Sequence, residues 1–183
     1  MSSKTPLPWR RFGRTGIEMP LLSLGGMRFQ QSWNDLEAEA IDIGSQHKLE
    51  YILREAVSKG FHHLETARHY GTSERQLGWA LQKVPDSKRL LQTKVPPREN
   101  AKHFEDELEL SFERLQIDRV DLLAIHGLNL REHLDQILRP NGCLEVVHRW
   151  QKGGRIGHVG FSTHAKVELI VEAIETDAFD FVN

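Results

Sequence analysis

Cysteine is nearly absent from this chain of 183 residues, and the single Cys143 excludes an internal disulfide and any cluster held by several cysteines. A basic excess is also missing, since 24 Lys and Arg stand against 26 Asp and Glu. We therefore expect neither a nucleic acid nor an anionic membrane as a partner. No apolar run approaches the roughly 20 residues that span a bilayer, and residues 1–10 lack the apolar core of a secretory signal. The expected compartment is the cytoplasm.

Two ligand-binding patterns are missing as well. No G-x-G-x-x-G motif opens a helix after the first expected strand, where Gly25 and Gly26 stand, which argues against a dinucleotide-binding open sheet. The ten histidines include no H-x3-H pair, and no Cys/His pair has the spacing of metal ligands. The sequence therefore predicts no metal site.

Short apolar segments alternate with amphipathic ones along the chain. Strands are expected at residues 21–26, 62–65, 89–94, 120–126, 156–161 and 179–183. Helices are expected from about residue 49 to Gly60, from Ser73 in a capping box, from the cap Asn100 to Leu115, from Leu144 to the glycine pair at 153–154, and over residues 167–174. The first of these strands, at residues 21–26, is expected to be buried.

Two further segments complete the expected layout. Residues 10–20 predict a hairpin whose turn lies between Gly13 and Gly16. Residues 28–46 are polar and irregular, and predict a loop with a short helix, with Trp33 as its one large anchor. Strands joined by helices of this length pair in parallel. Two architectures remain open: a complete open sheet, or a barrel cut short, because six strands are too few for a (β/α)8 barrel of about 250 residues.

Polar residues end four of the expected strands. Glu65, Lys94, His126 and Ser162 stand at these ends, and Tyr70 follows in the loop after Glu65. In a barrel the strand ends meet at one mouth, and catalytic groups come from several of them. A lysine beside a phenol stabilises the phenolate, so this set is suited to acid–base chemistry.

These blocks resemble the aldo-keto reductase superfamily. The matching stretches are Glu65-Thr-Ala-Arg-His-Tyr-Gly71, Lys94 at a strand end, Ile125-His126 and Gly157-His-Val-Gly-Phe-Ser162, in the family's order and spacing. The segment 60–74 is most similar to prokaryote-type members. The resemblance implies an α/β fold: a (β/α)8 TIM barrel of aldo-keto reductase type, truncated after about the sixth strand, with an N-terminal β-hairpin plugging its floor. Residues 1–183 would form one incomplete barrel domain, with its βα units over about 21–183.

The resemblance also implies an activity and roles for single residues. The activity is NADP(H)-dependent reduction of an aldehyde or ketone to an alcohol, with a small-molecule carbonyl compound as partner and NADPH, or else NADH, as cofactor. Tyr70 would be the general acid, assisted by Lys94, Glu65 and His126. Ser162, Thr163 and Asn183 would hold the nicotinamide carboxamide. The contacts to phosphate and adenine would lie after the seventh and eighth strands of the family's barrel.

Three positions depart from the family pattern. Glu65 stands in place of an aspartate, Thr163 in place of a common asparagine, and Asn183 in place of a common glutamine. An alternative therefore stays open, in which the chain is a non-catalytic truncated fragment or a partner-binding module. The sequence leaves the oligomeric state undecided.

Overall fold

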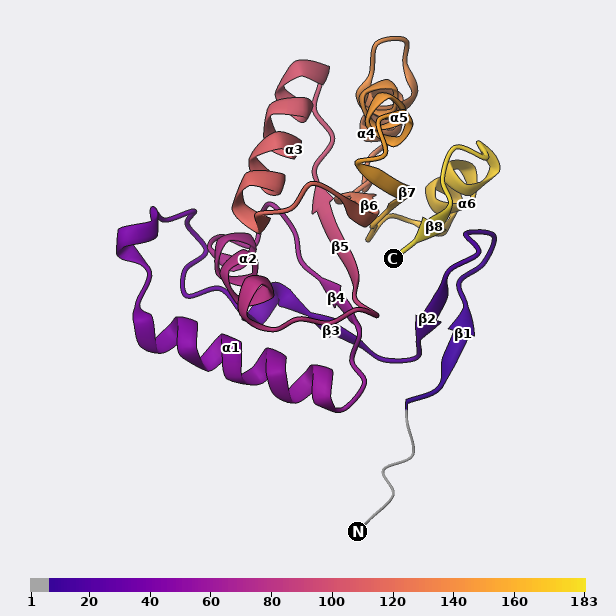
Figure 1. Cartoon of the computed structure of the whole chain (residues 1–183). Coiled ribbons are helices and arrows are strands. Elements are labelled where there is room, and N and C mark those ends of the chain that lie inside the picture. Colours follow the sequence, from indigo (N-terminus) through magenta and orange to yellow (C-terminus); the bar gives the residue numbers. More distant parts are fainter. Residues whose placement is uncertain (1–6) are drawn as a thin grey trace.

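Six parallel strands form a single curled sheet in the computed structural model, which describes residues 7–183. Each strand pairs with its neighbours in sequence, and the sheet curls into half of a barrel (Figure 1). The strands are β3 (Ser23–Gly25), β4 (His63–Glu65), β5 (Leu90–Val95), β6 (Val120–Ile125), β7 (Ile156–Phe161) and β8 (Phe181–Val182). The curled sheet confirms the barrel rather than the open sheet. Residues 1–6, counted above with the barrel domain, lie outside the described residues.

Helices pack along the outer side of the sheet. They are α1 (Ile43–Ser58), α2 (Ser73–Lys83), α3 (Ala101–Leu115), α4 (Arg131–Leu138), α5 (Cys143–Lys152) and α6 (Val167–Glu175), with the 3-10 turns η1 (Gly26–Arg28) and η2 (Ala38–Ala40). Asn100 caps α3 as expected, since its side chain accepts a hydrogen bond from the Lys102 amide at 2.8 Å. No helix among residues 7–183 has the length and apolar character needed to cross a membrane.

Alternation along β6 separates the two faces of the sheet. Leu123 and Ile125 are fully buried in the large core between the sheet and the helices. Leu122 and Ala124 point the other way and belong to a separate inner cluster with Phe181. Burial of a leucine or isoleucine side chain contributes about 1.5–3 kcal/mol. The outer core therefore fixes the strands on which the inner face depends.

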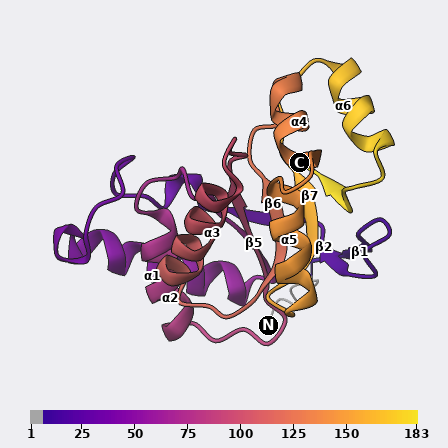
Figure 2. The ribbon, with the colours of Figure 1, turned by 90° about the horizontal axis from the view of Figure 1, so that it is seen from above.

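The N-terminal hairpin closes the inner face. Strands β1 (Trp9–Arg11) and β2 (Glu18–Pro20) pair antiparallel, and Gly13 and Gly16 take positive φ angles of 53° and 74° at the turn. The hairpin lies across the sheet from α1, α2 and α3 (Figures 1 and 2). Its apolar side chains pack on the inner cluster, with the Phe12 ring 5.5 Å from that of Phe181. The expected hairpin is confirmed.

Two expectations for the first half of the chain are wrong. The first strand covers only Ser23–Gly25, and Leu21 and Leu22 are 59% and 45% exposed. The strand lies at the sheet edge and pairs only with β4, so one of its sides has no neighbouring strand. Trp33 is also 59% exposed, so its side chain is not the buried anchor that was expected. Hydrogen bonds hold its segment instead, such as the 3.1 Å bond from the Thr72 amide to the Ser32 carbonyl.

Two helix expectations also need correction. Thr72, not Ser73, precedes α2, and no side chain caps this helix. The Ser73 hydroxyl instead donates to the Gly26 carbonyl at 2.9 Å, because tertiary contact with η1 takes the group that a capping box would use. Helix α4 falls in a stretch for which no element was expected. It has eight residues, no side-chain cap and only two buried residues, Leu134 and Ile137, so its periodicity is too short to be recognised.

Candidate active site

The polar residues expected at strand ends lie at one edge of the sheet. Glu65 is the last residue of β4, and Lys94 is the penultimate residue of β5. His126, Ser162 and Asn183 directly follow β6, β7 and β8. Because the strands are parallel, their carboxyl ends share one mouth, where barrel enzymes carry out their chemistry. The structure therefore brings these groups to the same end of the half-barrel.

Lys94 is only 3% exposed and lies at the centre of a cluster of acid–base residues that also contains Glu65 and Tyr70. Its Nζ donates to the Glu65 carboxylate, to Tyr70 Oη at 3.3 Å and to the Thr66 carbonyl at 3.3 Å. A buried ammonium is stable where such acceptors replace water. The extra methylene that distinguishes Glu65 from aspartate does not break the ion pair.

Tyr70 lies between Lys94 and His126. Lys94 Nζ is 4.9 Å from the centroid of the tyrosine ring, and the His126 ring stands edge-on to it, at 5.7 Å between centroids and 88° between planes. Because Tyr70 Oη accepts the hydrogen bond from Lys94, its own hydrogen can be donated elsewhere. This arrangement suits a phenol that gives up a proton.

His126 is held in the neutral form. Burial lowers its pKa to about 4, and the positive charge of Lys94 and the neighbouring His69 and His164 add to the lowering. Its Nδ1 is buried and has no hydrogen-bond partner among the residues that the structure describes. Its backbone amide donates to the Val95 carbonyl at 2.8 Å, which fixes the residue beside β5. A neutral imidazole in this place can donate or accept one hydrogen bond toward the mouth.

The two residues after β7, Ser162 and Thr163, differ in whether their hydroxyl hydrogen is free to bind a ligand. Ser162 Oγ accepts a hydrogen bond from the Gly127 amide at 3.0 Å, and its own hydrogen has no acceptor among residues 7–183. Thr163 Oγ1 donates to the Leu128 carbonyl at 2.7 Å and accepts from the Ala165 amide at 2.9 Å. Ser162 therefore keeps a donor for a ligand, whereas the Thr163 hydroxyl is already used inside the chain.

Asn183 is tied to the inner face of the sheet. Its Oδ1 accepts a hydrogen bond from Gln92 Nε2 at 2.8 Å, and its backbone amide donates to the Phe161 carbonyl at 2.9 Å. Gln92 is 1% exposed and precedes Lys94 by two residues on the same face of β5. The amide nitrogen of Asn183 is the group left for an external acceptor.

Several charged residues behind Tyr70 were not identified from the sequence. Arg68 is 7% exposed and pairs with Glu74, at 2.7 Å, and with Asp35. Glu74 is fully buried and also accepts a hydrogen bond from the Thr93 hydroxyl at 2.6 Å. Burial raises the pKa of Glu74, while Arg68 and Thr93 oppose the rise. Neither periodicity nor spacing in the sequence indicates such a network.

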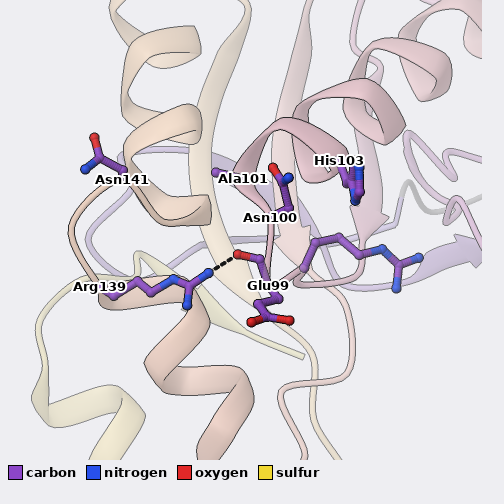
Figure 3. A pocket seen from close by; sticks show the side chains of 7 residues that line it. Glu99, Asn100, Ala101, His103, Arg139 and Asn141 are labelled. Atoms are coloured by element: carbon purple, nitrogen blue, oxygen red, sulfur yellow. Dashed lines mark hydrogen bonds between the residues drawn. The ribbon is translucent and has the colours of Figure 1, made fainter.

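A hollow elsewhere on the surface lies apart from these groups. It is lined at the start of α3 by Arg98, Asn100 and His103 and across from them by Arg139 and Asn141, with Arg139 bonded to the Glu99 carbonyl (Figure 3). None of the strand-end residues lines it. The candidate active site is therefore the cluster of Lys94, Glu65 and Tyr70, and not this hollow.

Comparison with known proteins identifies similar sequences and folds. A model of the aldo/keto reductase family matches residues 21–182. An uncharacterized oxidoreductase of Caenorhabditis elegans is 31% identical over 99 residues, which cover 51% of this chain and 30% of that protein. L-galactose dehydrogenase of Arabidopsis thaliana is 26% identical over 168 residues, which cover 86% of this chain and 49% of that protein. The chain thus spans less than half the length of either curated relative.

The fold comparison agrees with the sequence comparison. A crystal structure of a candidate aldo-keto reductase from Pseudomonas aeruginosa superposes with a TM-score of 0.76 at 25% sequence identity. The match covers 96% of this chain and 68% of that one. The expected barrel of aldo-keto reductase type, present here as six of its strands, is therefore confirmed.

Proposed function

The chain belongs to the aldo/keto reductase family, and from that premise we propose that it serves the reduction of an aldehyde or ketone to an alcohol, with NADPH as hydride donor and Tyr70 as general acid. The observation that carries the proposal is the position of Lys94 Nζ, held between the Glu65 carboxylate and the Tyr70 hydroxyl. This paired geometry favours an enzyme over a non-catalytic fragment. Residues 1–183 are proposed to be one barrel domain, incomplete as it stands, and the activity is proposed for the full-length protein.

Tyr70 supplies the proton in this scheme. Negative charge develops on the carbonyl oxygen during reduction, and the Tyr70 hydroxyl donates its proton to that oxygen. The ammonium of Lys94 then stabilises the phenolate that remains, while Glu65 keeps the ammonium in place. The neutral His126, edge-on to the Tyr70 ring, orients the carbonyl group by a hydrogen bond.

The residues at the other side of the mouth fit one end of the cofactor. NADPH supplies the hydride when bound. A nicotinamide carboxamide offers both an acceptor and donors, and the unused hydrogen of Ser162 and the amide nitrogen of Asn183 are matched to its oxygen. We assign to Thr163 the support of Ser162 through the Leu128 carbonyl, since its hydroxyl has no hydrogen to spare.

Replacement of the phenol tests the proposal. In the full-length protein, Tyr70→Phe is expected to lower kcat for a simple aldehyde by a factor of about 10²–10⁴, because the hydroxyl proton is needed only in the transition state. NADPH affinity, measured by protein fluorescence, is expected to stay near the wild-type value. Tyr51→Phe is the matched control, since Tyr51 is 65% exposed on α1. Wild-type turnover in Tyr70→Phe would remove Tyr70 from the mechanism.

A further inference from the structure

The segment that carries Tyr70 is enclosed by the loop at residues 31–35. Gly71 has a φ of +52°, and a side-chain carbon there would lie 2.0 Å from the Ser32 carbonyl oxygen. The amides of Gln31 and Ser32 both donate to the Thr72 hydroxyl, at 2.9 and 3.3 Å. The placement of Tyr70 therefore depends on contacts with a part of the chain that carries none of the strand-end residues.

Arg68 connects this segment to three other elements. Its Nη1 donates to Glu74 on α2 at 2.7 Å, and its Nη2 pairs with Asp35 in the loop. Its backbone amide donates to the Lys94 carbonyl on β5 at 2.8 Å. Glu74 in turn accepts from Thr93, the residue before Lys94, at 2.6 Å. Arg68 thus links its own segment, which carries Tyr70, to the strand that carries Lys94. It does so through its backbone amide and, by way of Glu74, through its side chain.

We propose that Arg68, held between Asp35 and Glu74, is a positioning residue that sets the Tyr70 hydroxyl against the Lys94 ammonium. The proposal rests on the proposed function, in which these two groups act together. The 3.3 Å contact joins Tyr70, two residues after Arg68, to Lys94, one residue after Thr93. A planar guanidinium can hold two carboxylates at once in fixed directions, whereas an ammonium offers no such fork. The charge of Arg68 alone is therefore not sufficient for its role.

A second ion pair provides a comparison within the same elements. Arg75 on α2 pairs with Glu37 of the neighbouring loop at 3.3 Å, and the Glu37 side chain is 77% exposed. This pair also links a loop to α2, but no hydrogen bond or ion pair joins its two side chains to residues 66–72 or to β5 in the part of the chain that the structure describes. Its loss is expected to leave Tyr70 unchanged.

The test compares three variants of the full-length protein: Arg68→Lys, Asp35→Asn and the control Glu37→Gln. Asp35 is 28% exposed at its side chain and also pairs with Arg114 on α3 at 3.3 Å, whereas Glu74 is fully buried. Asp35→Asn leaves Glu74 paired with Arg68 and is therefore expected to disturb the fold less than Arg68→Lys does. One readout is kcat together with the KM values for an aldehyde and for NADPH. The other is the 13C resonance of the tyrosine Cζ atoms, assigned with Tyr70→Phe and Tyr51→Phe, with Tyr51 as the internal reference.

Arg68→Lys and Asp35→Asn are expected to shift the Tyr70 resonance and to lower kcat about tenfold or more, with KM for NADPH unchanged, because small misplacements of reacting groups cost that much. Glu37→Gln is expected to match the wild type in both readouts. A Tyr70 resonance at the wild-type position in every folded variant of Arg68 and Asp35 would overturn the proposal. If the resonance shifts but Tyr70→Phe keeps its turnover, the positioning role stands and the proposed function fails.

Discussion

The two sides of the mouth differ in how their polar groups are partnered. On the β4–β5 side, Lys94 binds both Glu65 and Tyr70 and is 3% exposed. On the β7–β8 side, Ser162 and Thr163 bind the backbone of the segment after β6 instead. The first side is thus already organised for proton transfer. The second offers single hydrogen bonds to one end of a ligand.

Packing explains why the groups of the β4–β5 side stay paired. Strands β4 and β5 have a neighbouring strand on each side, and helix α3 packs on β5. A paired charge is stabilised where packing limits its contact with water. The proposed proton chemistry thus uses groups that already contact one another, whereas the proposed cofactor contacts are single hydrogen bonds.

The largest expected effect falls on the organised side. Lys94→Met removes the cation that holds the phenol and leaves the Glu65 carboxylate without its partner. We expect kcat for an aldehyde in the full-length protein to fall by a factor of about 10²–10⁴. Lys88→Met, at an exposed lysine before β5, is the control. Equal kcat values for Lys94→Met and Lys88→Met in steady-state assays would contradict the role proposed for the β4–β5 side.

A smaller effect concerns the neutral state of His126. Its pKa falls from 6.5 in the unfolded chain to about 4 in the folded one, so below pH 6.5 the unfolded state binds a proton that the folded state does not. Stability is therefore lost as pH falls from 6.5 toward 4, by about 2 kcal/mol at pH 4.5. His126→Gln is expected to remove this part of the loss, whereas the exposed His103→Gln is not.

Urea unfolding at pH 7 and pH 4.5 measures this difference. Burial also lowers the pKa values of His63 and His69, so part of the acid sensitivity is expected to remain in the His126→Gln variant. An equal loss of unfolding free energy in wild type and His126→Gln would show that the folded protein protonates His126 as readily as the unfolded chain does.

The smallest expected effects lie on the cofactor side. Ser162→Ala removes a free donor and is expected to raise KM for NADPH about threefold to tenfold, as the loss of one hydrogen bond does. Thr163→Val is expected to leave that KM unchanged and to cost about 1 kcal/mol of stability, because its bond to Leu128 is lost. Kinetics and urea unfolding separate the two. A larger rise in KM for Thr163→Val than for Ser162→Ala would reverse their assigned roles.

Sequence patterns predicted the fold wherever an element has its own signal. The apolar run that predicts β6 and the cap at Asn100 are local signals, and both elements appear in the structure. The predictions for Ser73 and Leu21 were wrong. The Ser73 hydroxyl bonds the Gly26 carbonyl in place of capping its helix, and Leu21 precedes the strand and is 59% exposed. A sequence pattern reflects neighbours along the chain and does not predict contacts with distant segments.

The candidate site divides in the same way. Strand-end residues such as Lys94 and His126 could be predicted, because a parallel sheet carries all strand ends to one mouth. Arg68 could not, since its partner Asp35 is 33 residues away in a loop without periodicity. The residues proposed to react could be predicted from the sequence, and the one proposed to position them could not.

A calorimetric titration of a polypeptide of these 183 residues with NADPH tests the contrast between the two sides most directly. Ser162 and Asn183 offer about 0.5–1.5 kcal/mol per hydrogen bond, whereas association costs about 4–15 kcal/mol. We therefore predict no binding in the low micromolar range, and no change on Ser162→Ala. A low micromolar Kd from a monodisperse monomer would contradict it, because groups other than those described on the β7–β8 side would then hold the cofactor.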